Sequence, residues 1–257
     1  MNNLFVFDLD DTLMDNVHDY SESILNMCRV IIEELKSAAP HVSIIVALED
    51  EIDLRRRFQT NPKTGKQYGY SMDRFLGTMV ETYREICERI GIKADPTTES
   101  RLYYIGMNAF KIDRYERNIK PNTKEVVDFL DSQGDLLLIY TAGDERVQEK
   151  KMSVLSEAGI NFSFVEITDK KNYMFFAQLA EKHPGKALYS VGNNYMSDIA
   201  PAISAGFRGI YIPVETWETI GKMGQIRSEI NWERCIELRS LIEIKEKYTE
   251  LDAKGGE

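Results

Sequence analysis

The chain has 257 residues, of which 43% are hydrophobic, so it can bury a substantial core and is not expected to be disordered. Its formal net charge of −10 argues against a nucleic-acid partner, because such binding depends largely on Lys and Arg that neutralise phosphates. Cys28, Cys87 and Cys235 are widely spaced and form no CxxC or Cys/His cluster, so they indicate neither a disulfide framework nor a zinc site, and we interpret them as packing residues. No signal peptide or membrane span is visible at the N-terminus. We therefore expect a soluble, cytoplasmic monomer or small homo-oligomer with no membrane partner.

The first apolar run, residues 4–7, predicts a buried strand that leads directly into Asp8-Leu9-Asp10-Asp11-Thr12. One residue separates Asp8 from Asp10, so both carboxylates leave the strand end on the same side. Two neighbouring anions cost free energy unless a cation compensates them. In a parallel α/β sheet the carboxyl ends of the strands form the ligand crevice. The pair is therefore expected where both a cation and a substrate can reach it.

Residues 16–119 contain no convincing strand and have long apolar patterns with a period of 3.6 residues, which predicts a helical insert after the first strand. The two apolar stripes are Ile24, Cys28, Ile31, Ile32 and Leu35, and Phe75, Met79, Tyr83, Ile86 and Ile90. Asp95 followed by Pro96 predicts the start of a further helix that runs to Phe110. The turn-rich loop 61–70 is either a solvated connection between helices or a loop that selects the substrate.

Four further apolar runs predict strands buried on both faces: residues 136–140, 162–167, 187–191 and 209–212. Stretches with helical spacing lie between them, and right-handed crossovers then predict an α/β fold with a doubly wound parallel sheet. Asn122 and Glu125 form the pattern of a capping box, and Gly134 and Gly159 lie where helix C-caps are expected.

Two of these strands end in residues suited to binding an anion. The second strand runs into Thr141-Ala142-Gly143, a hydroxyl followed by backbone N–H groups loosened by glycine, which is a phosphate-binding arrangement. The third is followed by Asp169-Lys170-Lys171, which supplies a positive charge. The two adjacent lysines leave the register open. We favour Lys170, because Phe175 then falls on the inward face of the next helix, and Lys171 is the alternative.

The fourth strand leads into a segment that places the amide of Asn193 and the carboxylate of Asp198 five residues apart, across the start of a helix. Oxygen ligands of this kind suit Mg²⁺, which prefers a few carboxylates and keeps several waters. The alternative is that Asn193 and Ser197 are turn and cap residues, with Asp198 offering its charge to the helix N-terminus.

The acidic pair, the threonine, the lysine and the Asn–Asp pair each follow a different predicted strand at one edge of the sheet. With this arrangement the chain resembles the haloacid dehalogenase superfamily. The four motifs of that superfamily match Asp8 to Thr12, Thr141, Lys170 or Lys171, and Gly192 to Asp198. The resemblance implies a catalytic core of residues 1–15 and 120–257, with residues 16–119 forming an all-helical cap that excludes water from the site.

The resemblance also implies a phosphomonoester hydrolase that acts on a small phosphorylated metabolite. Asp8 would attack phosphorus and form an aspartyl-phosphate, and Asp10 would shuttle the proton. Thr141 and the lysine would bind the transferred phosphoryl group. Asp8, the backbone carbonyl of Asp10, Asp198 and Asn193 would hold Mg²⁺. Many members carry Asp in place of Asn193, so this chain has one negative charge fewer beside the metal.

Several alternatives stay open. A phosphomutase would keep all these residues, and a non-catalytic phosphate-binding or signalling module would keep part of them. A receiver domain is disfavoured, because it has no place for an insert of this length. A dehalogenase is disfavoured by Asp10, for which it has no use. Arg55, Arg56 and Arg57 are candidates for a distal anion contact, although three consecutive helical residues cannot all face one site. Thr216-Trp217-Glu218 also resembles a subset of the superfamily, with a core Trp as the alternative.

Overall fold

The structure is a computed structural model that describes residues 3–216 and 219–255 of the chain. The chain forms two compact units. The core unit consists of Met1–Asp15 with Tyr115–Glu257, and the helical unit consists of Asn16–Arg114. The sequence placed the second boundary after residue 119, whereas here it falls inside helix α5 (Ile112–Arg117). Tyr115 already belongs to the core unit, where its ring centroid lies 5.5 Å from Lys151 Nζ.

The core unit is built on a six-stranded sheet in which every pairing is parallel, with the order β3-β2-β1-β4-β5-β6. The strands are β1 (Leu4–Phe7), β2 (Leu136–Ala142), β3 (Phe164–Thr168), β4 (Leu188–Gly192), β5 (Arg208–Tyr211) and β6 (Cys235–Glu237). This confirms the predicted doubly wound parallel sheet, to which β6 adds an unpredicted edge strand. The strand order reverses at β1, so the carboxyl ends of β1 and β4 flank the crevice where ligands bind in such sheets.

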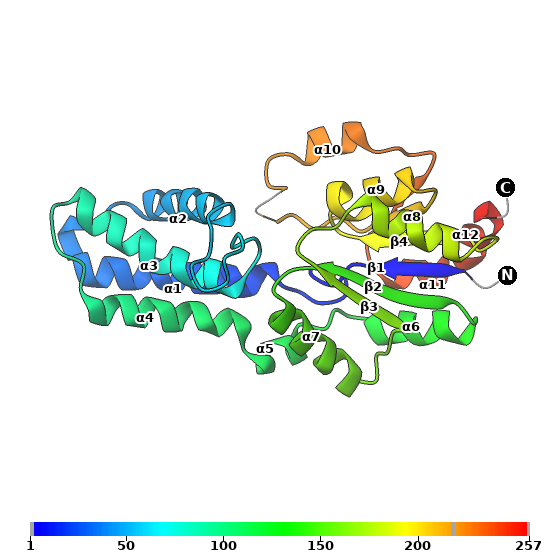
Figure 1. Ribbon diagram of the computed structural model, residues 1–257, viewed down its shortest axis with the longest axis horizontal. Coiled ribbons are helices and arrows are strands. Elements are labelled where there is room, and N and C mark those ends of the chain that lie inside the picture. Colours follow the sequence, from blue (N-terminus) through cyan, green and yellow to red (C-terminus); the bar gives the residue numbers. More distant parts are fainter. Residues whose placement is uncertain (1–2, 217–218, 256–257) are drawn as a thin grey trace. The chain divides into compact units, whose positions relative to one another are not determined.

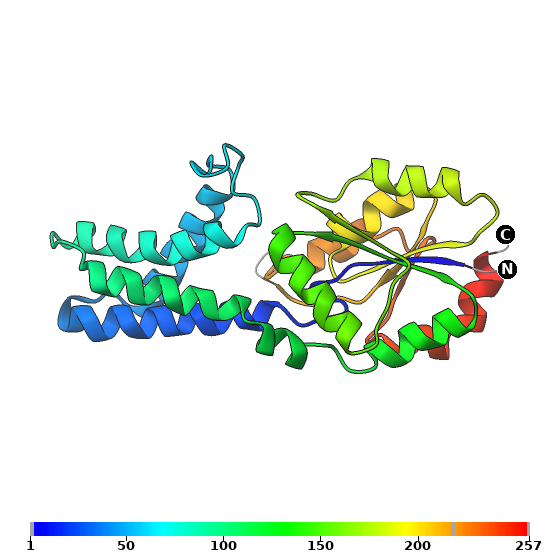
Figure 2. The same cartoon turned by 60° about the horizontal axis from the view of Figure 1, so that its bottom comes forward.

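Helices cover both faces of this sheet, as Figures 1 and 2 show. Leu4 and Val6 of β1 pack on one face against Phe176 of α8 and Ala202 of α9. On the opposite face Phe5 stacks on Tyr189, with ring centroids 4.8 Å apart. Alternate residues of β1 thus reach opposite layers, which explains its continuous apolar run. The helices of the core unit are α6 (Thr123–Ser132), α7 (Glu145–Glu157), α8 (Tyr173–Lys182), a π-helical turn (Tyr195–Ile199), α9 (Ala200–Ser204), α10 (Met223–Glu229), α11 (Ile242–Glu246) and α12 (Tyr248–Gly255).

The predicted helix ends have mixed outcomes. Gly134 and Gly159 follow α6 and α7 directly after their C-caps with φ values of +76° and +73°, which confirms both C-cap assignments. The capping box at Asn122 is wrong. Asn122 has φ +65° and its side chain makes no cap hydrogen bond, because the chain turns there in the left-handed region and not in the extended conformation of an N-cap.

The helical unit contains α1 (Val17–Leu35), α2 (Val42–Arg57), α3 (Met72–Arg89) and α4 (Pro96–Met107), with 3₁₀ turns at Lys36–Ala38 and Asn108–Phe110. Both predicted stripes face its interior in the main, but Ile32 and Ile90 are 42% and 37% exposed. Asp95 caps α4 as predicted, since its Oδ2 accepts a hydrogen bond from Thr98 N at 2.9 Å. No helix in the described part of the chain combines the length and apolarity needed to cross a membrane.

The loop between α2 and α3 is ordered by contacts inside the helical unit. Thr60 and Gln67 form an isolated antiparallel bridge. The guanidinium of Arg56 lies 4.5 Å from the ring centroid of Tyr68. Gly77 of α3 makes room for Arg56, because a Cβ at Gly77 would lie 2.1 Å from its Nη2. The loop is therefore a structured hairpin, and its part in choosing a substrate stays a prediction.

Candidate active site

The predicted residues of the four motifs gather at the carboxyl ends of the strands of the core unit. Lys171 Nζ lies 2.5 Å from Asp8 Oδ1 and 2.8 Å from Asp198 Oδ1, so a single ammonium joins the residue after β1 to the segment after β4. The three side chains are between 4% and 8% exposed. Thr12 Oγ1 also donates to Asp8 Oδ2 at 2.8 Å. Asp8, Asp198 and the alternative lysine, Lys171, thus form a buried ionic cluster from residues up to 190 positions apart.

The preference for Lys170 over Lys171 is wrong. Lys170 is exposed, whereas Lys171 is buried and holds both carboxylates. Strand β3 ends at Thr168 and Asn172 caps α8, so the lysine immediately before the cap points into the site. Phe175 does face inward, stacking on Tyr140 at 3.9 Å between ring centroids, but this position does not determine which lysine enters.

Burial and charge act in opposite directions on this cluster. Burial raises the pKa of Asp8 to about 7, against the lowering effect of Lys171. Burial would lower the pKa of Lys171, but Asp198 and Asp8 raise it above its ordinary value. Asp198 is further held by Ser197 Oγ at 2.9 Å and by Asn194 N at 2.9 Å. The lysine is therefore firmly charged, and it favours the ionised form of the carboxylate that a nucleophile needs.

The side-chain amide of Asn193 links the segments that follow β4 and β1. With its nitrogen turned toward them, it donates to Asp8 Oδ2 and to the backbone oxygen of Asp10, each at 3.2 Å. In the described residues no three His, Cys, Asp or Glu side chains form a metal cluster. The mixed set of carboxylate, carbonyl and amide oxygens nevertheless fits a hard cation such as Mg²⁺.

Thr141 lies at the end of β2 with an exposed fraction of 0%. Within the described chain its Oγ1 has no hydrogen-bond partner, which is unusual for a buried hydroxyl. The predicted phosphate-binding turn needs one correction. Gly143 N donates to Thr168 O at 3.0 Å, because the pairing of β2 with β3 continues past Ala142, so this N–H is used by the sheet.

Sequence reasoning missed two residues of α7 that contact Asp10. Gln148 Nε2 donates to Asp10 Oδ2 at 2.8 Å, and Lys151 Nζ forms an ion pair with Asp10 Oδ1. Both α7 residues are 2% exposed. The available signal was their spacing. Gln148 and Lys151 lie three residues apart and so share one face of the helix that follows the Thr141 turn, next to the apolar stripe that includes Val147.

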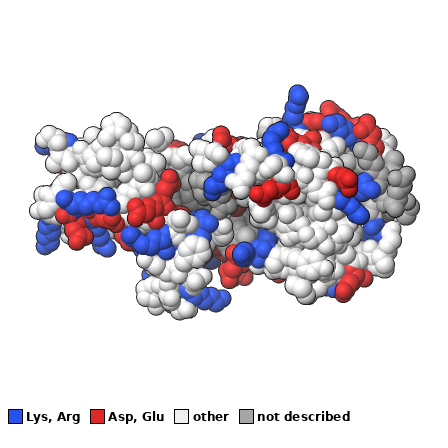
Figure 3. Space-filling view, turned by 90° about the horizontal axis from the view of Figure 1, so that it is seen from above, with Lys and Arg blue, Asp and Glu red and all other residues white. Residues whose placement is uncertain are grey.

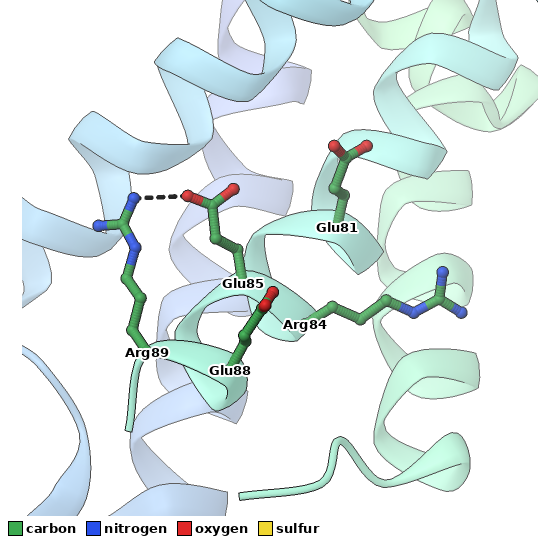
Figure 4. Close-up of a pocket in the computed structure, with 5 residues that line it drawn as sticks. All are labelled: Glu81, Arg84, Glu85, Glu88 and Arg89. Carbon is green, nitrogen blue, oxygen red and sulfur yellow. Dashed lines mark hydrogen bonds and ion pairs between the residues drawn. The ribbon is translucent and has the colours of Figure 1, made fainter. Parts of the chain in front are cut away.

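Other charged candidates have partners within the helical unit. Arg55 and Arg56 pair with Glu81 at 2.9 and 2.7 Å. A surface pocket of about 420 Å³ on α3 is lined by Glu81, Arg84, Glu85, Glu88 and Arg89, and Figure 4 shows Arg89 paired with Glu85. Figure 3 likewise shows Lys and Arg beside Asp and Glu on one face of the molecule.

Trp217 and Glu218 of the predicted Thr216-Trp217-Glu218 motif lie outside the described residues.

No protein-family model and no curated protein matches the chain. Solved structures do match it along almost its whole length. A haloacid dehalogenase-like family hydrolase from Xanthomonas campestris is 20% identical, with a TM-score of 0.70 and coverage of 99% of this chain and 98% of that one. A 2-haloacid dehalogenase from Pseudomonas syringae is 20% identical, with a TM-score of 0.58 and coverage of 99% of both chains.

A protein described as a HAD-hydrolase from Bacillus subtilis, bound to magnesium, is 17% identical, with a TM-score of 0.55 and coverage of 98% of this chain and 99% of that one. Further matches include L-2-haloacid dehalogenases and a predicted phosphoglycolate phosphatase. The core sheet, its strand order and the matched structures together assign the chain to the fold of the haloacid dehalogenase-like hydrolases.

Proposed function

We propose that this protein is a magnesium-dependent phosphomonoester hydrolase that acts through an aspartyl-phosphate on Asp8. The observation that carries the proposal is the second carboxylate, Asp10, beside the buried nucleophile. Hydrolysis of a phosphate ester needs a proton for the leaving oxygen and a base for the attacking water. A dehalogenase expels halide, which leaves without a proton, and would have no use for Asp10.

In the first step an oxygen of Asp8 attacks phosphorus, the bond from phosphorus to the ester oxygen breaks, and Asp10 gives its proton to the departing alcohol. In the second step water attacks the same phosphorus and gives a proton to Asp10. The bond to Asp8 then breaks and inorganic phosphate leaves. The hydroxyl of Thr141, for which the described residues supply no partner, is available to donate to a phosphoryl oxygen, and Lys171 offsets the charge of nucleophile and phosphate.

The residues present fit the proposed Mg²⁺, with Asp8, the backbone carbonyl of Asp10, Asn193 and Asp198 as its holders. When bound, Mg²⁺ supplies positive charge that stabilises the transferring phosphoryl group. Charge counting supports this assignment. With Asp10 protonated, as the first step requires, Asp8 and Asp198 against Lys151 and Lys171 leave the site neutral, and a phosphate monoester would then add two negative charges. We also propose that the helical unit is a cap that helps to choose a small phosphorylated metabolite.

The decisive experiment measures phosphate release from a panel of phosphomonoesters with Mg²⁺, for the wild type and for Asp8→Asn. A parallel assay measures halide release from 2-haloacids. We expect phosphate release that is lost in Asp8→Asn and is kept in Asp169→Asn, which changes an exposed carboxylate near the site. Halide release would assign a dehalogenase instead. Conversion of a phosphate ester into an isomer without release would assign a phosphomutase.

A further inference from the structure

The carboxylate of Asp10 is held at both of its oxygens by one helix. Gln148 Nε2 donates to Oδ2 at 2.8 Å and Lys151 Nζ is paired with Oδ1. We propose that Gln148 and Lys151 are positioning residues that aim Asp10 at the leaving group and at the attacking water. This inference rests on the proposed hydrolase function and goes beyond it, because it assigns a role to α7, which carries none of the predicted motif residues.

The two contacts have the character of a built site. Lys151 and Gln148 are each 2% exposed, and a buried ammonium is costly unless it is paired. The Asp10 side chain is 22% exposed, so α7 binds its carboxylate and still leaves it accessible. Each carboxylate oxygen accepts two hydrogen bonds. The donors that the described residues supply, one on each oxygen, fix the rotation of the carboxylate and leave a lone pair on each for substrate or water.

Gln148 also ties Asp10 to the strand end that carries Thr141. Its Nε2 donates to Ala142 O at 3.3 Å. A Cβ on Gly143 would lie 2.5 Å from the same Nε2, so the close approach needs glycine. The amide of Gln148 thus lies between the carboxylate of Asp10 and the strand end that carries the hydroxyl of Thr141. A single residue of α7 therefore contacts the carboxylate and this strand end at once.

A purely structural role for Lys151 and Gln148 makes a different prediction from a positioning role. Alkyl phosphates lose a poor leaving group and need the proton from Asp10, whereas p-nitrophenyl phosphate releases a stable phenolate that needs little help. If Asp10 is no longer held in position, hydrolysis of the alkyl ester should therefore slow much more than hydrolysis of the aryl ester. Loss of stability or of the active fraction would slow both equally.

The experiment compares Lys151→Met and Gln148→Leu with Lys150→Met, an exposed lysine on the same helix. We expect kcat/KM for β-glycerol phosphate to fall by about 100-fold and that for p-nitrophenyl phosphate by less than about tenfold, in line with the usual size of general acid catalysis. Lys151→Arg should restore part of the activity on the alkyl ester. In an Asp10→Asn background, Lys151→Met should cost less than about threefold, because the group that it positions is gone.

Equal losses on both esters, or a full further loss in the Asp10→Asn background, would overturn the assignment. If Lys151→Met does not fold, Gln148→Leu alone decides by the same two criteria. A wild type that releases no phosphate from either ester would refute the proposed function, and the positioning role with it. An active wild type with additive, substrate-independent losses would refute only the positioning role.

Discussion

Replacing Thr141 by Val should make the protein more stable and less active. The hydroxyl is fully buried and has no partner in the described chain, and an unsatisfied buried polar group costs about 1–3 kcal/mol. Val has nearly the same shape and no polar atom. We therefore expect the free energy of unfolding to rise by about 1 kcal/mol or more, which corresponds to a Tm increase of about 2–4 °C for a chain of this size.

The activity should move in the opposite direction. A hydrogen bond to a charged group is worth about 1.5–3 kcal/mol, and each 1.4 kcal/mol is tenfold in rate, so kcat/KM for phosphate release should fall by roughly 10- to 150-fold. Thermal unfolding and a phosphate-release assay on the same preparations test both signs. Thr123→Val is the matched control, because its buried hydroxyl donates to Leu13 O at 3.1 Å and its loss should lower stability. If Thr141→Val is destabilised like Thr123→Val, the hydroxyl is satisfied without a ligand and the reasoning is wrong.

Three further predictions address charge, pH and thiol reactivity. Lys171→Met removes the cation between two buried carboxylates, so it should lower the free energy of unfolding by about 3–5 kcal/mol and abolish turnover. Lys170→Met should change neither. Thermal unfolding and phosphate release measure the two effects. Burial and nearby acidic groups raise the pKa of Glu49 to about 8, so the native state binds its proton more tightly than the unfolded chain and stability should fall as pH rises from about 4.5 to 8. Glu49→Gln should unfold at a higher temperature than the wild type at pH 8.5 and at a similar one at pH 5, and a constant difference at both would contradict this. Burial raises the pKa of Cys235 to about 12, so this thiol should react with Ellman's reagent only after unfolding.

Strands β1, β2 and β4 were predictable because they are largely buried on both faces and therefore read as continuous apolar runs. The expectation of burial on both faces is wrong for β3, which lies at the edge of the sheet and has no buried residue. The edge strand β6 was not predictable, because Cys235–Glu237 is only three residues long and gives no period to detect. The site residues directly after the strands were predictable for a topological reason, since parallel strands place their carboxyl ends at one edge.

What the sequence could not fix was the exact register and the contribution of helix faces. The choice between Lys170 and Lys171 depends on a single residue at the end of β3. Gln148 and Lys151 meet Asp10 across 138 and 141 residues of chain, so their spacing on α7 indicates a shared helix face but not the carboxylate that this face contacts. Contacts of this kind become visible only after the helix is packed on the sheet.

Several features of this edge are hard to explain by folding alone. Thr141 keeps a buried hydroxyl that has no partner among the described residues, and Asp8 and Asp198 are buried on either side of one lysine. An apolar residue in place of Thr141, or an apolar set in place of the two carboxylates together with their lysine, would serve the core as well or better, because unpaired and like-charged buried groups oppose stability. A hydroxyl with no partner in the described part of the chain, next to buried carboxylates at one strand edge, is what the proposed phosphate ester and Mg²⁺ would use.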